Sequence, residues 1–430
     1  MTIDPYLIVR AASLYVAAVA TMAVWWWRRP DRRAVAGAAL AFAWNLPVVL
    51  AINVVADRAG WWQFDASGGQ LLGVPVDLYL AWAWLWGFAA ALAFPELSIV
   101  AVVVIALVCD LILMPAASPV VQLGRSWLAG EALALVTALV PGQLLARWTR
   151  RNESLERRAA LQVLTAGGVV GFVLPAVIIQ ESGGRWSNPL DQPERLMLFA
   201  QVLAIPILAG VSAVQEFVTR GGGTPVPFDP PRRLVTSGLY AYVRNPMQLS
   251  GVLFLVLLGL LVDNLWISAA GIMAHVYSAG IAGWDEDGDL ERRFGSQWLE
   301  YRGAVRRWMP RFRPWHPSNR AGQLFVAESC GMCRGVARWV ERRDPRHLVI
   351  EAAEAHPSAA LTRITYDPRD GSPPARGVEA VARALEHIHI GWALAGCVLR
   401  LPGIRQTAQL LVDASGGEPR PANQSCSWPT

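Results

Sequence analysis

The sequence predicts an all-α polytopic membrane helix bundle of about nine spans, followed by a small cytoplasmic α/β domain. Of its 430 residues, 54% are hydrophobic and only 17% are charged, whereas soluble domains carry about 25% charged residues. The mean hydropathy is +0.33. Apolar stretches recur at lengths close to the roughly 20 residues that a spanning helix needs. After residue 323 the chain changes to short alternating strand and helix patterns, which are typical of a soluble α/β unit.

Nine apolar stretches are the predicted spans. They run over 6–27, 34–55, 72–94, 97–115, 127–147, 160–180, 196–218, 247–262 and 264–283. Only "VDN" joins the last two, so we expect a tight antiparallel hairpin there. This hairpin would return the chain to the face of the membrane from which it entered.

Arginine clusters predict the orientation in the membrane. "RRPDRR" (28–33), "ARWTRRNESLERR" (146–158), the loop 219–246 and the segment after 283 are basic, and nine spans place all four on one side. The positive-inside rule then puts the N-terminus outside and the C-terminal domain in the cytoplasm. We expect an integral protein of a bacterial cell membrane, in contact with membrane lipids. The net charge of +5 is small, so the arginines indicate topology and not a nucleic-acid partner.

The stretch "SGLYAYVRNPMQLSG" lies directly before and within the eighth span. Asn245 can cap a helix and Pro246 suits its first turn, so one interpretation is a helix start with Arg244 at the membrane interface. The pattern is longer than a cap needs, because Gly238 permits a close backbone approach and Tyr240 adds a flat, polar-tipped surface. A cation beside a helix N-terminus favours an anionic ligand group.

Carboxylates follow the predicted hairpin at Asp285, Glu286 and Asp287. Because the hairpin returns to the same membrane face, we expect these acids to lie near Arg244. A site with a cation at one end and a carboxylate at the other suits a zwitterion that carries a hydroxylated sugar. S-adenosylmethionine is such a molecule, since its carboxylate prefers Arg or helix N–H groups and its ribose or amino group prefers a carboxylate.

A family resemblance rests on residues of both segments. They are Gly238-Leu239-Tyr240, Arg244-Asn245-Pro246, Gly251, Glu286-Asp287, Leu290, Phe294-Gly295, Tyr301, Val305, Arg307 and Pro310. In order and spacing, over about 200–312, they resemble the isoprenylcysteine carboxyl methyltransferase and phospholipid methyltransferase group of integral-membrane enzymes. The resemblance implies that this region wraps S-adenosylmethionine on the cytoplasmic side, while a lipophilic, isoprenoid- or lipid-linked substrate enters from the bilayer. The cofactor-binding residues that it implies are Gly238, Tyr240, Arg244, Asn245, Pro246, Glu286, Asp287 and Tyr301.

Five positions depart from the pattern of that family. Asn245 stands where the family has His, Gln248 where it often has Tyr, Leu239 where Pro is common, and Trp298 where Tyr is common, while Asp287 shortens the second acid. Asn keeps a hydrogen bond that His makes but cannot take a proton near neutral pH. We therefore expect cofactor binding to survive but no base at this position. The alternative is a non-catalytic, lipid-binding membrane scaffold with a degenerate methyltransferase segment.

Two cysteines, Cys330 and Cys333, follow a predicted strand and begin a predicted helix. A helix N-terminus lowers the pKa of a thiol, so the pair suits redox chemistry. Half of a zinc site and an incidental pair are the alternatives, and no second ligand pair follows at zinc spacing. The stretch 323–405 resembles the thiol–disulfide oxidoreductases named for an Asp-Cys-x-x-Cys motif, with Glu328 and Ser329 replacing the usual Gly and Asp. This implies a thioredoxin-like fold and a thiol reductant or redox partner.

The predicted domains follow from these assignments. Membrane helices without an assigned role occupy 1–190, the methyltransferase domain with its cofactor-binding tail 191–315, the thioredoxin-like domain 323–412 and a disordered tail 413–430. Within the thioredoxin-like domain we expect strands at "QLFVA", "HLVIEAA" and "LTRITYD", and helices at "CRGVARWVERR" and "GVEAVARALEHI".

Three carboxylates lie in or at the start of apolar spans of the N-terminal half. They are Asp77, within "GVPVD", Asp110 and Glu131. Carboxylates inside a membrane are costly and usually line a polar cavity or join helices. The first stretch weakly resembles the membrane-bound lycopene cyclases, which would imply an isoprenoid-modifying enzyme. Polar bonding between helices and the shaping of a lipid-substrate cavity are the other interpretations.

Overall fold

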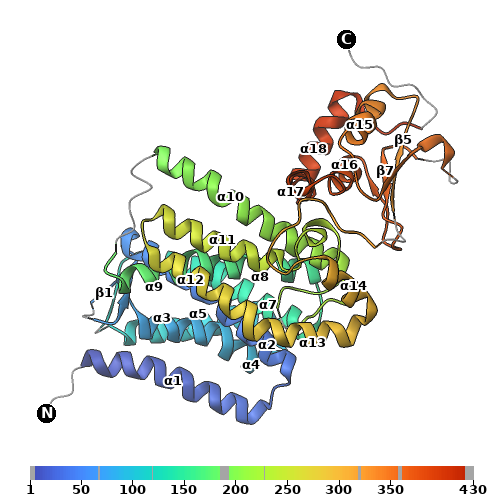
Figure 1. Cartoon of the computed structure of the whole chain (residues 1–430). Coiled ribbons are helices and arrows are strands. Elements are labelled where there is room, and N and C mark those ends of the chain that lie inside the picture. The colour runs from blue at the N-terminus through green and yellow to red at the C-terminus, as the bar shows by residue number, and fades with distance from the viewer. Residues whose placement is uncertain are drawn as a thin grey trace. The chain divides into compact units, whose positions relative to one another are not determined.

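The computed structural model describes residues 5–65, 68–118, 120–184, 193–226, 228–317, 321–356 and 361–421, of which Pro5 and 281–286 are described without their side chains. Most of these residues are helical (Figure 1). The chain forms two compact units. The first consists of Met1–Pro189, Thr224–Pro230 and Val262–Ile267, and the second of Leu190–Gly223, Pro231–Leu261 and Ser268–Thr430.

Helices of the first unit follow the predicted spans. They are α1 (Pro5–Arg28), α2 (Arg32–Ala59), α3 (Val76–Trp84), α4 (Ala90–Ala93), α5 (Ile99–Ala116), α6 (Trp127–Ala134), α7 (Val140–Arg151), α8 (Leu155–Gly168) and α9 (Leu174–Glu181). Single π-helical turns join α3 to α4, α6 to α7 and α8 to α9 into continuous helices. Two short antiparallel pairs complete the unit: β1 (Trp62–Phe64) with β4 (Val121–Leu123), and β2 (Gln70–Leu71) with β3 (Val74–Pro75).

Seven helices in the described ranges are long and apolar enough to cross a membrane, as expected of a membrane protein. They are Tyr6–Arg28, Arg32–Ala59, Val76–Ala93, Ile99–Ala116, Trp127–Arg151, Leu155–Glu181 and Pro193–Gly221. The predicted start of the third span at residue 72 is wrong. Residues up to Pro75 form the β2–β3 hairpin instead, because a proline disfavours helix in the residue before it. The predicted total of nine spans stays a prediction.

The predicted eighth and ninth spans are shorter helices, α11 (Pro246–Leu261) and α12 (Leu265–Tyr277). They run side by side (Figure 1). The Ser268 hydroxyl donates to the main-chain oxygen of Val256 at 2.9 Å. A Cβ on Gly271 would lie 3.1 Å from the oxygen of Val252, so the glycine lets the two backbones approach. Position 268 thus faces 256 and 271 faces 252, which confirms the antiparallel hairpin.

Asp229 joins basic segments that were predicted to share one side of the membrane. Its carboxylate lies 2.8 Å from Arg158 Nη2 and 3.9 Å from Arg33 Nη2. On the other predicted side, β1 pairs with β4, and these strands come from two of the less basic loops. Both sets of contacts agree with the predicted grouping of the loops. Which side faces the cytoplasm stays a prediction.

Helices of the second unit begin with α10 (Pro193–Glu216) and continue with α11, α12, α13 (Gly283–Phe294) and α14 (Ser296–Ala304). A C-terminal α/β domain follows. Its elements are β5 (Gly322–Val326), α15 (Gly331–Glu341), β6 (Leu348–Ala352), β7 (Thr365–Asp367), β8 (Ala375–Arg376), α16 (Val378–Leu385), α17 (Ile390–Leu399) and α18 (Ile404–Val412). The sheet order is β6-β5-β7-β8, with β5 parallel to β6 and the other neighbours antiparallel.

The C-terminal domain differs from its prediction in three places. The strand expected at 361–367 is confined to β7, and helices α17 and α18 were not predicted. Where a disordered tail was expected, Asp413 and Ala414 continue the helix, and the chain then turns away at Ser415 and Gly416, which have non-helical backbone angles. Arg363 holds this turn through an ion pair of 2.5 Å to Asp413. Residues 418–421 of the predicted tail are described and form neither helix nor strand, and residues 422–430 lie outside the described part of the chain.

Candidate functional site

The predicted cofactor turn comprises residues 237–246 and contains a short 3₁₀ helix, η6 (Gly238–Ala241). The segment after the helix hairpin holds it in place. The Tyr301 hydroxyl donates to the main-chain oxygen of Tyr240 at 2.8 Å, and the Arg244 N–H donates to the oxygen of Arg306 at 3.0 Å. The structure therefore brings together the two segments that carry the sequence motif.

Arg244 lies beside a carboxylate, as predicted. Asp287 Oδ1 is 2.5 Å from Arg307 Nη2 and 3.6 Å from Arg244 Nη1. Two guanidinium groups thus share one carboxylate oxygen, which leaves an excess of positive charge among the described side chains of this cluster. The side chain of Glu286 lies outside the described residues, so its predicted role stays a prediction.

Three buried N–H groups of this cluster have no hydrogen-bond acceptor among the side chains and main-chain groups that the structure describes. Arg244 Nε, Arg244 Nη1 and Trp298 Nε1 are buried, and within the described part of the chain no acceptor is found for them. The Arg244 guanidinium also lies 5.4 Å from the centre of the Trp298 ring. Buried donors without acceptors are costly. The group that fits them best is an anionic oxygen.

Burial lowers the pKa of Arg244, and the charge of Asp287 opposes this effect. Burial also raises the pKa of Tyr301, so its phenol stays protonated and serves as a donor. Asn245 directs its side-chain amide to Gln248 Oε1 at 3.0 Å, and Pro246 is the first residue of α11, as the helix-start interpretation predicts. Asn245 and Tyr301 therefore act as hydrogen-bond donors, and neither serves as a base.

Gly238 has a positive φ of +61°, which glycine adopts without strain. A Cβ there would lie 3.3 Å from Glu216 Cγ and 3.4 Å from Arg400 Nη2. Its N–H donates to Glu386 Oε2 at 3.2 Å. The close approach that Gly238 permits is therefore to Glu216 and the C-terminal domain. Its predicted contact with a cofactor stays a prediction.

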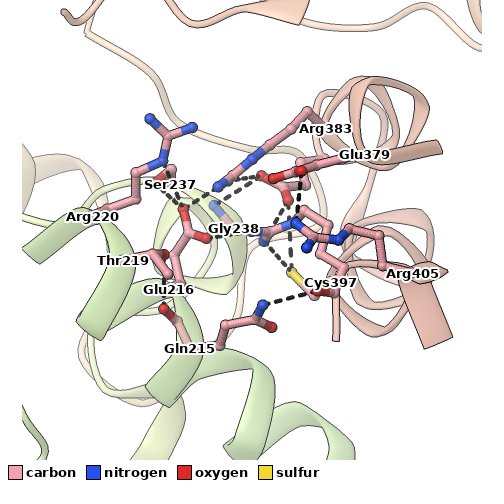
Figure 2. A network of polar contacts seen from close by, with 12 residues as sticks. Gln215, Glu216, Thr219, Arg220, Ser237, Gly238, Glu379, Arg383, Cys397 and Arg405 are labelled. Carbon is pink, nitrogen blue, oxygen red and sulfur yellow. Dashed lines mark hydrogen bonds and ion pairs between the residues drawn. The ribbon is translucent and has the colours of Figure 1, made fainter. Parts of the chain in front are cut away.

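A buried ion network, here called the Glu216 network, consists of Glu216, Arg383, Glu386 and Arg400. Figure 2 labels Glu216 and Arg383. Glu216 pairs with Arg383 at 2.7 Å and with Arg400 at 2.6 Å. Glu386 pairs with Arg383 at 3.2 Å and with Arg400 at 2.7 Å. All four side chains are at most 5% exposed. The sequence analysis missed this network, although a carboxylate inside the apolar stretch 196–218 was a usable signal.

A polar cavity of about 430 Å³ lies between the cofactor turn and the C-terminal domain. Its wall includes Ser237 and Glu300 from the segments around the turn, and Tyr366, Arg383 and His387 from the C-terminal domain. Both parts of the second unit therefore line one cavity, which suits a charged or strongly polar molecule.

The thiol pair lies at the start of α15, as predicted. Cys330 is its N-cap and Cys333 lies in its first turn. Cys330 is disulfide-bonded and Cys333 is a free thiol, so the two sulfurs are not joined to each other. Both residues line a largely apolar cavity of about 340 Å³, together with residues of α16 and α18.

Burial raises the pKa of the Cys333 thiol, and the negative charge of Glu354 acts in the same direction. Cys333 should therefore react slowly with iodoacetamide at pH 7.5, because the thiolate is the nucleophile. Glu354→Gln should speed this reaction at least about twofold by lowering the pKa. Glu351→Gln is the matched control, since that carboxylate bonds Gln323. Mass spectrometry of the alkylated peptide measures the rate, and equal rates in both variants would contradict the electrostatic role of Glu354.

Two stacked histidines lie in the C-terminal half, His316 and His387, with ring centres 4.4 Å apart. His387 Nδ1 lies 2.7 Å from the oxygen of Arg346 and its Nε2 lies 2.9 Å from the Tyr366 hydroxyl. The carbonyl requires a donor at Nδ1, so neutral His387 accepts a hydrogen bond from the Tyr366 hydroxyl at Nε2. Burial lowers the pKa of both histidines.

The C-terminal domain should lose stability on acidification. Below about pH 6.5 these histidines bind protons in the unfolded chain but stay neutral in the folded chain. The loss of stability therefore grows as the pH falls. At pH 5.5 we expect a loss of at most about 1.4 kcal/mol for each histidine, which is reached when the folded histidine stays neutral at that pH. Hydrogen exchange of the β5 amides, corrected for intrinsic pH dependence, measures it. His387→Gln should reduce the loss of stability at low pH, and His389→Gln should not. If both variants show the same pH dependence, His387 is not a source of this loss.

The carboxylates of the N-terminal half bond to neighbouring elements. Asp77 pairs with Arg10 at 2.6 Å, and Asp110 accepts a hydrogen bond from Trp86 Nε1 at 3.2 Å. Glu131 lies beside Asp110 and lines a cavity of only about 50 Å³. These contacts are those of polar bonding between helices. In the described ranges no group of three His, Cys, Asp or Glu side chains could hold a metal ion.

Comparison with models of protein families, with curated proteins and with solved structures finds no match to this chain. The resemblances over 200–312 and 323–405 are therefore carried by short motifs alone. The structure brings together the side chains of Arg244, Asp287 and Arg307 at the turn, and it places Cys330 and Cys333 in the lining of one cavity.

Proposed function

We propose that this chain is an integral-membrane methyltransferase that uses S-adenosylmethionine and acts on a lipophilic, isoprenoid- or lipid-linked substrate. The observation that supports it most is the cluster of Arg244, Asp287 and Arg307, with buried N–H donors on Arg244 and Trp298 that lack acceptors in the described residues. Such donors suit the carboxylate of an amino-acid cofactor.

Each residue of the turn has a distinct task in this proposal. Arg244, next to the N-terminal end of α11, holds the cofactor carboxylate, since both the cation and the helix dipole favour an anion. Asp287, with Glu286, accepts hydrogen bonds from the amino group or the ribose. The hydrogen bond from Tyr301 to the oxygen of Tyr240 keeps the turn in place.

When bound, S-adenosylmethionine supplies an electrophilic methyl group on a positively charged sulfur. The chain then has to align the substrate nucleophile with that methyl group and to exclude water. Asn245 cannot accept a proton near neutral pH. We therefore favour a nucleophile that is ionised without help, which means a carboxylate or a thiolate.

The substrate would reach the site from the bilayer along α11 and α12. Large apolar side chains on these helices are exposed: Leu253, Leu260, Ile272, Met273 and Val276. In a membrane these side chains would face lipid or a lipophilic substrate. The turn and the C-terminal domain would lie on the cytoplasmic side, with the N-terminus outside.

The C-terminal domain supports a second function in thiol chemistry. The order β5–α15–β6 followed by β7, β8 and α16, with the two cysteines at the start of α15, supports the proposal of a thioredoxin-like domain. The raised pKa of Cys333 makes Cys330 the better candidate nucleophile once it is reduced. The cavity beside both thiols is apolar, which suits a partner with an apolar group.

Calorimetric titration of S-adenosylmethionine into the purified chain in lipid nanodiscs tests the methyltransferase proposal. We expect binding in the micromolar range, as is usual for enzyme substrates, and displacement by S-adenosylhomocysteine. Empty nanodiscs are the control. A wild-type chain that binds neither molecule would overturn the proposal and favour a scaffold with a degenerate site.

A further inference from the structure

The cofactor turn is bonded to the C-terminal domain at two points, both through Glu386. The Gly238 N–H donates to Glu386 Oε2 at 3.2 Å. The Tyr242 hydroxyl donates to the main-chain oxygen of Glu386 at 2.8 Å. Glu386 directly follows α16, so one residue of the C-terminal domain holds both ends of η6.

Glu386 is itself held by Arg383 and Arg400 within the Glu216 network. The Ser237 hydroxyl of the turn donates to Glu216, and Glu216 lies at the end of α10 (Figure 2). The network therefore joins α10, the turn and the C-terminal domain. Because its charges are buried, a separation of these parts would leave charges without partners, which is strongly unfavourable.

The backbone of the turn has little freedom under these contacts. Tyr242 is fully buried, and η6 packs against α10 and α17. Arg244 follows two residues after Tyr242, so the position of its guanidinium depends on where Tyr242 is held. The polar cavity beside Ser237 has Arg383, Glu386 and His387 in its wall, which adds the C-terminal domain to the surroundings of the turn.

We infer that the C-terminal domain is a positioning element of the cofactor site, and that Glu386, fixed by Arg383 and Arg400, holds the turn in the conformation that binds the cofactor. This inference rests on the proposed methyltransferase function. Glu386 is a positioning residue that acts through the backbone at Gly238 and the side chain of Tyr242. The thiol domain is then required for cofactor binding, whether or not its thiols react.

Three variants of the full chain in nanodiscs test this inference. Glu386→Ala removes the acceptor for the Gly238 N–H, Glu386→Gln keeps an acceptor but loses the charge, and Tyr242→Phe removes one hydroxyl with little risk to folding. Glu379→Gln is the matched control, because it also removes one carboxylate charge, here from α16 in a partly exposed ion pair with Arg405. Calorimetry measures S-adenosylmethionine affinity, and hydrogen exchange measures the amides of residues 237–246.

We expect affinity to fall at least about tenfold in Glu386→Ala and Tyr242→Phe, less in Glu386→Gln, and within about twofold in the control. Exchange in the turn should rise in the same order. If Glu386 only stabilised the fold, the variants would differ in thermal stability, but the folded proteins would not show this order of S-adenosylmethionine affinities. Unchanged exchange, or faster exchange with wild-type affinity, overturns the inference. If the wild type does not bind S-adenosylmethionine, the methyltransferase proposal itself is overturned. If the wild type binds and the variants bind equally well, only the inference about Glu386 is overturned.

Discussion

Replacing Arg244 by alanine should lower the affinity for S-adenosylmethionine at least about 100-fold. Hydrogen bonds to charged groups contribute about 1.5–3 kcal/mol each, and about 1.4 kcal/mol corresponds to a factor of ten. Arg244 offers two buried N–H groups without acceptors in the described residues, so its loss removes more than one such bond. Asp287 would remain paired with Arg307, which limits the damage to the fold. Calorimetric titration in nanodiscs measures the change.

Two further variants sharpen this test. Arg244→Lys keeps the charge but not the planar guanidinium, so we expect an intermediate affinity. Arg302→Ala removes an arginine of the same region that is exposed and lies 3.6 Å from Glu291, and it should bind like the wild type. Wild-type affinity in a folded Arg244→Ala variant would remove Arg244 from the proposed site.

Glu216→Gln should destabilise the attachment of the C-terminal domain by about 3–5 kcal/mol, because breaking a buried ion pair leaves an uncompensated charge. Arg383 and Arg400 would share the single carboxylate of Glu386. Cys397 reports the opening, since its thiol is 1% exposed and lies 3.5 Å from Arg400 Nη2. Its labelling by a thiol reagent should accelerate by about two to four orders of magnitude, since each 1.4 kcal/mol corresponds to about a factor of ten.

The control for this labelling experiment is a substitution at Glu379, which Figure 2 labels. Glu379→Gln breaks the partly exposed pair with Arg405 and should change the rate by no more than about twofold. Cys397 labelled at the wild-type rate in Glu216→Gln would mean that the network does not hold the domain. The cofactor affinity of this variant should fall as well, because Ser237 loses its charged acceptor.

Together these contacts indicate that the two parts with proposed activities depend on each other structurally. A tethered domain would need only a flexible connection. Here the C-terminal domain contributes Arg383, Glu386 and Arg400 to a buried network with a membrane helix, and it bonds the cofactor turn directly. Removal of the domain should therefore impair the proposed cofactor site and not merely delete the thiol chemistry.

Local features were predictable because they depend on neighbouring residues. Long apolar runs predicted the seven helices, and Pro246 marked the start of α11. The short connection after Leu261 predicted the α11–α12 hairpin, since two helices joined by three residues have to pack antiparallel. The hairpin in turn predicted that an acid would lie near Arg244, and Asp287 does.

Other features could not be predicted because their causes lie far apart along the chain. Arg383 and Glu386 occur on a helix with alternating charges, a pattern that is typical of a solvated surface. In the tertiary structure Arg383 pairs with Glu216, which lies 167 residues earlier in the chain, and Glu386 pairs with Arg383 and Arg400, so all these charges are buried together. Gly238 suggested a close approach to a ligand, but the approaching groups are Glu216 and Arg400.

The sequence by itself determined that the chain is helical and membrane-embedded, where the turn before α11 lies, and that an α/β domain with a thiol pair follows. Hydropathy and the residue preferences of helix starts depend on residues close together in the chain, so both can be recognised from the sequence alone. Only the tertiary structure decided which charges are buried together and that the C-terminal domain holds the cofactor turn. The partner of a buried charge is set by packing between distant segments, and no local pattern encodes it.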